Sequence, residues 1–143
     1  MRYLPLFIIS LIILSFKGSD ETETSKLYQQ ALCAHLSTGD KIDTVYIMKS
    51  FDIKLPSKIK NYHIIDVTDS LEFFLKNKKS LYVIKLLPIE VNQGNIEIGM
   101  IDYGVTKEKG EVMMAWSGSK IFTYKYSTKA KQYKLINIKK YTI

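Results

Sequence analysis

The sequence is poor in the residues on which several kinds of chemistry depend. Its 143 residues include one cysteine, two histidines and three prolines, and the only arginine is Arg2. The lone cysteine, Cys33, excludes an intramolecular disulfide, and two histidines leave few choices for acid–base catalysis or metal binding. We therefore expect no resident metal and no other cofactor.

Motifs that carry enzymatic chemistry are also missing. The sequence contains no Walker loop, G-x-G-x-x-G, G-x-S-x-G, C-x-x-C or H-E-x-x-H pattern. Ser57–Lys60 and Ser117–Lys120 match S-x-x-K, but a chain so rich in Ser and Lys gives about two such matches by chance. The companion motifs of penicillin-binding enzymes are absent. The sequence thus favours a non-enzymatic protein over an enzyme.

Long apolar runs are missing apart from a short one near the N-terminus. Leu4–Phe16 spans 13 residues that are apolar except for Pro5 and two serines, whereas a bilayer crossing needs roughly 20. A run of this length behind the basic Arg2 is typical of a secretory signal peptide. We therefore expect residues 1–18 to be a signal peptide and residues 19–143 to form a single exported domain, periplasmic or extracellular, without a transmembrane helix.

The predicted cleavage site is poor. Signal peptidases favour small residues at the last and third-last positions of the signal. Cutting after Gly18 or Ser19 leaves Phe16 or Lys17 at the third-last position. An uncleaved N-terminal membrane anchor is therefore the alternative, and a buried first element of the domain is another.

Acidic residues are missing after Glu111. Residues 112–143 contain seven lysines and no Asp or Glu, for a net charge of +7, whereas residues 20–111 contain 12 lysines and 14 acids, for a net charge of −2. Lysine supplies positive charge without the planar fork by which arginine reads phosphates and guanine. This pattern favours diffuse attraction to anionic polymers or membrane surfaces and argues against sequence-specific nucleic-acid binding. An AT-rich coding sequence explains the missing arginine equally well.

Hydrophobic periodicity predicts two helices and several strands. The spacing predicts a helix over 24–37 and a short amphipathic helix that contains Leu71, Phe74 and Leu75 and ends at residues 77–79. The predicted strands cover 44–51, 62–67, 81–91, 96–105, 112–116, 120–126 and 132–143, with a turn or a bulge at residues 117–119 and a loop over 56–61. Pro88 predicts a bulge or a free backbone position within the strand over 81–91. The apolar face of the strand over 96–105 changes near residues 99–101, which predicts a bulge or bend.

These elements predict an α+β fold. The economical arrangement packs the N-terminal helix on a curved, mainly antiparallel sheet of five to seven strands, because each then buries the other's apolar face. The order of helix, two strands, short helix and antiparallel meander resembles that of cystatin-like and NTF2-like rolls. The resemblance covers residues 19–143, rests on element order without any motif, and implies architecture only.

Lysines and aromatic residues are interleaved in the C-terminal third, as they are on surfaces that hold extended anionic chains. The predicted binding residues are Lys120, Tyr124, Lys125, Tyr126, Lys134 and Lys139. The ordinary explanation is also open, since strands favour aromatic residues and lysines on edge strands prevent unwanted pairing.

Catalytic alternatives rest on few residues. His63 and Asp66 lie three residues apart on a predicted strand and should point to opposite faces, so we predict no metal site there. A carboxylate pair from Glu90, Glu97 and Asp102 is the other candidate. The leading hypothesis is an exported binding module that contacts a protein or an anionic envelope polymer. The alternatives are an envelope hydrolase and an inhibitor or immunity-like partner of a secreted enzyme, and the oligomeric state stays open.

Overall fold

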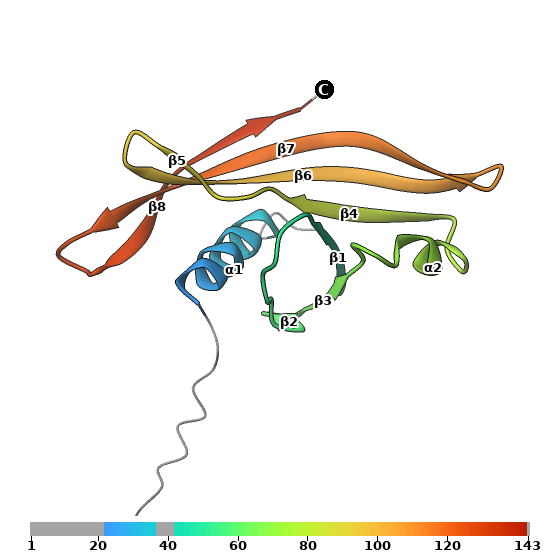
Figure 1. Cartoon of the computed structure of the whole chain (residues 1–143), viewed down its shortest axis with the longest axis horizontal. Coiled ribbons are helices and arrows are strands. Elements are labelled where there is room, and N and C mark those ends of the chain that lie inside the picture. The colour runs from blue at the N-terminus through green and yellow to red at the C-terminus, as the bar shows by residue number, and fades with distance from the viewer. Residues whose placement is uncertain (1–21, 37–41, 143) are drawn as a thin grey trace, which may run out of the picture.

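The computed structural model describes residues 22–36 and 42–142. Within this range one long helix packs on a mixed, open sheet of eight strands (Figure 1). In chain order the elements are α1 (Glu23–Leu36), β1 (Thr44–Lys49), β2 (Lys58–Ile59), β3 (Tyr62–Asp66), α2 (Leu71–Leu75), β4 (Ser80–Leu86), β5 (Glu90–Asn92), β6 (Asn95–Glu108), β7 (Glu111–Ser127) and β8 (Gln132–Tyr141).

The sheet mixes parallel and antiparallel pairs. Its strands follow the order β2-β3-β1-β4-β6-β7-β8, and β5 pairs with β6 beside this path. Strand β1 runs parallel to both β3 and β4, and the other pairs are antiparallel. Strands β6 and β7 are the longest strands of the sheet and run along the long axis of the molecule (Figure 1).

Helix α1 covers one face of the sheet. Its buried stripe contains Leu27, Tyr28, Ala31 and Leu32. The strand residues of the same cluster are Val45, Ile47, Ile84, Leu86, Ile98, Met100, Phe122 and Tyr124. The Tyr28 hydroxyl donates a hydrogen bond of 2.6 Å to the Leu87 carbonyl and ties the helix to the end of β4. Burial of these apolar side chains is the main force that holds α1 on the sheet.

A second cluster lies on the opposite face, under α2. It contains Tyr46, Val67, Leu75, Leu81, Val83 and Val105. This arrangement explains the predicted change of apolar face in β6, because Ile98 and Met100 face α1 whereas Tyr103 and Val105 face the α2 side. The register of β6 and β7 shifts between Asp102 and Tyr103, where Ser117 is the extra residue of β7, so the irregularity expected at residues 117–119 is a bulge. Strand β6 itself pairs in continuous register with β7 up to Asp102 and with β4 from Met100 to Thr106, so no bulge lies at residues 99–101.

The structure confirms the α+β class and the helix packed on a sheet, and it differs in detail. The expected strand over 81–91 is split around Pro88 into β4 and β5, because proline cannot donate a ladder hydrogen bond. The expected loop over 56–61 contains the two-residue strand β2. The sheet therefore has eight strands rather than five to seven. The predicted signal peptide lies outside the described residues.

Candidate binding surface

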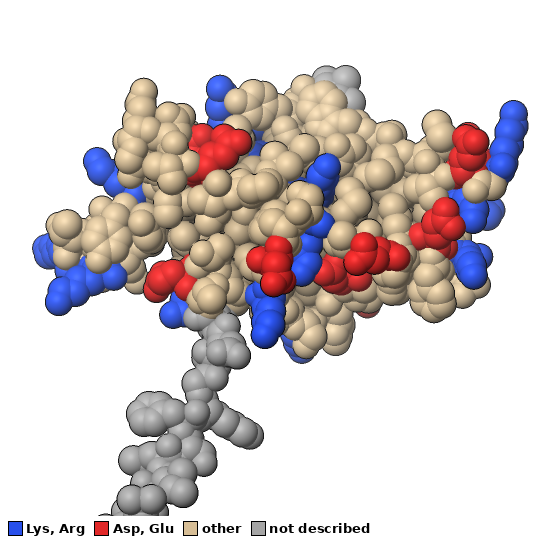
Figure 2. All heavy atoms as spheres, viewed as in Figure 1, with Lys and Arg blue, Asp and Glu red and all other residues tan. Residues whose placement is uncertain are grey.

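The C-terminal part of β7, the turn after it and β8 form a hairpin that carries only positive charge. We call residues 119–142 the basic hairpin. It contains seven lysines and no acid. Figure 2 shows lysines at the end of the molecule where β7 turns into β8, whereas acids and lysines are mixed through the middle and at the opposite end of the same view. At this end the rings of Tyr126 and Tyr133 pack edge to face, with centroids 5.2 Å apart.

The register of the hairpin divides its side chains between two faces. Lys125 lies opposite Lys134, and Lys139 lies opposite Ile121. Side chains alternate along β7, so Lys125 points away from the face that carries Tyr124 and α1, and its partner Lys134 does the same. The register shifts at Ile136, the extra residue of β8, and this shift returns Lys139 to the same outer face as Lys134. All three lysines are exposed, and we call them the outer strip.

Tyr141 borders this strip. The ammonium nitrogen of Lys139 lies 5.0 Å from the centroid of the Tyr141 ring. A hydrogen bond with Tyr141 raises the pKa of Lys139, and the nearby Glu97 carboxylate adds to this effect. The Tyr141 ring therefore lies beside the charge of Lys139 on the outer face of the hairpin.

The six predicted site residues do not form one surface. Lys125, Lys134 and Lys139 are exposed on the outer face, whereas Tyr126 retains 48% of its surface but lies on the α1 side, opposite Tyr133. Tyr124 is 0% exposed and belongs to the core beneath α1, so it cannot stack on a partner. The physical reason is strand alternation, which points Tyr124 to the opposite face from its neighbour Lys125.

Lys120 also faces α1 and is half-buried. Its ammonium group donates a 3.3 Å hydrogen bond to the carbonyl of His35 at the end of the helix. Burial lowers the pKa of Lys120, while the Asp102 carboxylate opposes this effect and the charge of Lys140 adds to it. Lys120 thus supports the helix end rather than the outer strip.

A buried hydrogen-bonded pair that the sequence analysis missed joins α1 to β6. The Nε2 atom of His35 lies 2.8 Å from Oδ1 of Asp102, and their side chains are 3% and 12% exposed. Burial alone would raise the pKa of the Asp102 carboxyl. Hydrogen bonds from His35 and Tyr82, with the charge of Lys120, instead hold this pKa below its ordinary value. The arrangement fixes the end of the helix against the sheet.

The sequence contained a signal for this pair. Asp102 falls two residues after Met100 on the apolar face of β6, and a lone acid at such a position requires a partner. His35 lies on the buried stripe of α1, one turn beyond Ala31 and Leu32. The two residues lie 67 positions apart in the sequence. Periodicity can predict that each side chain is buried, but it cannot predict that the two contact each other.

The structure does not assemble the catalytic candidates into one site. Glu90 and Glu97 lie directly opposite each other on β5 and β6, beside a small cleft of about 110 Å³ that Leu87 and Ile121 also line. Asp102 lies on the other face of β6. His63 is exposed on β3 opposite Thr44 and Lys58. Within 22–36 and 42–142 no three His, Cys, Asp or Glu side chains gather closely enough to hold a metal ion.

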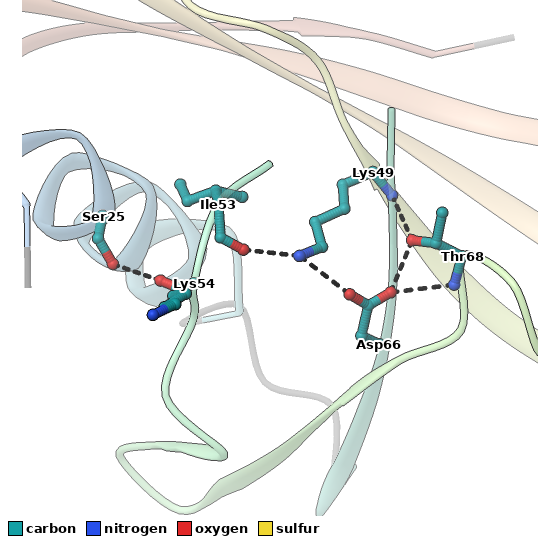
Figure 3. Close-up of polar contacts among 6 residues, drawn as sticks. All are labelled: Ser25, Lys49, Ile53, Lys54, Asp66 and Thr68. Atoms are coloured by element: carbon teal, nitrogen blue, oxygen red, sulfur yellow. Dashed lines mark hydrogen bonds and ion pairs between the residues drawn. The ribbon is translucent and has the colours of Figure 1, made fainter. Parts of the chain in front are cut away.

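A second polar network holds the loop that follows β1 (Figure 3). The Lys49 ammonium donates to the Ile53 carbonyl at 2.6 Å and lies 3.1 Å from Oδ2 of Asp66. Asp66 also accepts hydrogen bonds from the backbone and hydroxyl of Thr68. Burial alone would raise the pKa of the Asp66 carboxyl. The hydrogen bonds from Thr68 and the contact with Lys49 together hold this pKa below its ordinary value.

This network borders a cleft of about 330 Å³ at the carboxyl ends of β1 and β3. Such ends often carry ligand sites in sheets with parallel strands. Here, however, the Lys49 ammonium is engaged by the loop and by Asp66. The Ser25 hydroxyl similarly donates to the Lys54 carbonyl at 2.6 Å. These polar groups serve to anchor the loop against α1 and β3.

Comparison of the chain with family models, curated proteins and solved structures finds no match. The likeness in element order to cystatin-like and NTF2-like rolls therefore gains no support from a solved structure. In the part of the chain that the structure describes, every helix is too short or too polar to cross a bilayer. The physical properties of the basic hairpin are then the strongest guide to function.

Proposed function

We propose that the protein is an exported, non-enzymatic binding module whose basic hairpin contacts an acidic protein or an anionic polymer of the cell envelope. The observation that carries this proposal is the outer strip of Lys125, Lys134 and Lys139. These side chains are exposed, share one face and belong to a segment without any acid. Clustered charge of one sign attracts partners of the other sign and speeds their encounter.

The chemistry of the strip favours a diffuse anionic partner. Lysine ammonium groups act as point charges on flexible stems and lack the two-pronged geometry that reads one particular anion. The exposed ring of Tyr141 adds apolar contact area beside these charges on the outer face, whereas Tyr126 lies on the α1 side of the hairpin. We therefore expect a partner recognised by the density of its negative charge.

Charge reversal tests this proposal. The triple variant Lys125→Glu, Lys134→Glu, Lys139→Glu should bind fluorescent poly-L-glutamate, and separately polyphosphate, at least about tenfold more weakly than the native chain. The matched control is Lys76→Glu, Lys79→Glu, Lys107→Glu, which changes the net charge equally at exposed sites outside the hairpin. Equal loss in both triple variants would mean that net charge alone drives binding, which contradicts a specific surface.

Export is the second part of the proposal, and the short apolar run behind Arg2 supports it. An intact mass of the native product, measured separately in cytosol, envelope and medium, tests it. We expect a product shorter by about the first 18 residues, found outside the cytosol. A full-length product confined to the soluble cytosol would contradict export.

A further inference from the structure

Strand β8 forms a long edge of the sheet. The sheet order ends at β2 on one side and at β8 on the other. Strand β2 has two residues, whereas β8 has ten. Among residues 22–36 and 42–142, only β7 pairs with β8. The other edge of β8 therefore presents backbone N–H and C=O groups that can pair with an added strand.

We propose that the partner of the basic hairpin is an acidic polypeptide segment that joins the sheet as an antiparallel strand beside β8. This inference rests on the proposed function and makes its partner more specific. In strand addition, main-chain hydrogen bonds supply affinity and alternate side chains supply specificity. The sequence of β8 indicates what those side chains must be.

The two faces of β8 differ in chemistry. Its outer face carries Lys134 and Lys139, whereas Leu135 and Ile138 lie on the α1 side opposite Tyr124 and Phe122. Lys140, near the end of β8, lies on the α1 side as well, opposite Lys120. Leu135 and Ile138 retain 39% and 38% of their surface, so the apolar layer under the hairpin continues to the edge without cover from the described residues. A strand that alternates acidic and apolar residues would pair with both faces at once.

The same charges disfavour a second copy of this chain as the occupant. The register of β7 and β8 shifts at Ile136, which is the extra residue of β8, so Lys134 and Lys139 share the outer face. Two antiparallel β8 strands that keep their outer faces on one side are centred between Ile136 and Asn137, and this register places Lys134 of each copy opposite Lys139 of the other. Like charges directly opposite each other destabilise a strand pair. The lysines thus prevent self-pairing, as they do on other edge strands, and favour an acidic partner.

Backbone methylation of a peptide ligand tests strand addition without altering the protein. The probe is a capped ten-residue peptide that alternates Glu with Val or Thr. Successive N–H groups of a strand point to opposite edges, so N-methylation at every Glu blocks one edge and N-methylation at every Val or Thr blocks the other. The two methylated peptides have identical charge and composition.

We expect one methylated peptide to bind at least about tenfold more weakly than the parent and the other to bind like the parent, because only one edge of the peptide loses its main-chain hydrogen bonds to β8. Amide hydrogens along β8 should also exchange more slowly in the complex. Equal affinity of the two methylated peptides, whether both keep or both lose binding, would overturn strand addition.

The outcomes separate this inference from the proposed function. One outcome supports the proposed function but not this inference. In it, poly-L-glutamate binds through Lys125, Lys134 and Lys139, while the two methylated peptides bind with equal affinity. Polyphosphate that outcompetes the parent peptide would favour a polymer and overturn the polypeptide partner. If the native chain self-associates and the variant Lys134→Glu self-associates more strongly, the occupant of the β8 edge is a second copy of the chain, and the acidic partner is wrong. If no anionic probe binds, the proposed function fails as well.

Discussion

At the scale of single residues, the hydrogen-bonded pair of His35 and Asp102 joins helix α1 to the sheet in a buried place. A carboxylate that loses water without gaining partners costs several kcal/mol. Asp102 gains the imidazole of His35 at 2.8 Å, and the Lys120 ammonium, which bonds the helix end, lies near enough to interact with it. The pair thus links the last turn of α1 to the middle of β6, and removing one member leaves the other buried without its partner.

The variant Asp102→Asn should lower the free energy of unfolding by about 1–3 kcal/mol, because a charge-assisted hydrogen bond is lost in a buried place. Urea unfolding at pH 7 measures this change. The control is Asp69→Asn, the same chemical change at an exposed position, where we expect a change within about 0.5 kcal/mol. Equal stability of the two variants would show that the buried pair contributes nothing.

Asp102 also determines how the free energy of unfolding changes with pH. The pKa of Asp102 in the folded chain lies below its ordinary value of 3.8, so the unfolded chain binds the proton more tightly. The stabilisation is therefore complete above about pH 4 to 5 and is lost as the pH falls through the folded pKa. Asp66 acts in the same direction, but its side chain is 48% exposed and solvent weakens its share.

Unfolding curves between pH 6 and pH 2 check this expectation. The native chain should lose more free energy of unfolding over this range than Asp102→Asn does, since the variant cannot titrate at this site. Parallel pH profiles for the two proteins would place the acid-sensitive group elsewhere.

At the scale of elements, hydrophobic periodicity predicted most helices and strands because each element satisfies its own local pattern. The helix over 24–37 and the strands near 44–51 and 62–67 correspond to α1, β1 and β3. The parallel pairing of β1 with β3 and β4 could not be predicted in this way, since strand direction depends on long-range packing. Pro88 marked a break whose consequence, the separate strand β5, required the fold.

Local sequence patterns also predicted part of the candidate surface. The run of lysines without acids identifies the basic hairpin directly. Strand alternation separates Lys125 from Tyr124, and the structure adds that α1 covers the face of Tyr124. The position of β8 at the edge of the sheet follows from the strand order alone, which no local pattern contains.

The packing of α1 on the sheet provides the test at this scale. Leu32 is 0% exposed within the core cluster, so Leu32→Ala should lower the free energy of unfolding by about 2–5 kcal/mol through lost burial and the cavity left behind. Gln30→Ala, at an exposed position of the same helix, is the control and should have little effect. Comparable loss in both variants would indicate that helix formation rather than packing limits stability.

At the scale of the whole molecule, charge is divided between its parts. Residues 20–111 carry a net charge of −2 and residues 112–143 carry +7, and the fold gathers much of the second set on one protruding hairpin (Figure 2). An anionic partner therefore meets one attractive end rather than a uniformly basic surface. Such attraction between exposed charges weakens as salt shortens the Debye length from about 30 Å at 0.01 M to 8 Å at 0.15 M.

The most direct measurement is the affinity of the native chain for poly-L-glutamate across a series of sodium chloride concentrations, with the triple hairpin variant in parallel. We expect the affinity of the native chain to fall steeply with salt and the affinity of the variant to be weak and nearly independent of salt. Binding by the native chain that does not change with salt, or an equal slope in the variant, would contradict the claim that the basic hairpin is the binding surface.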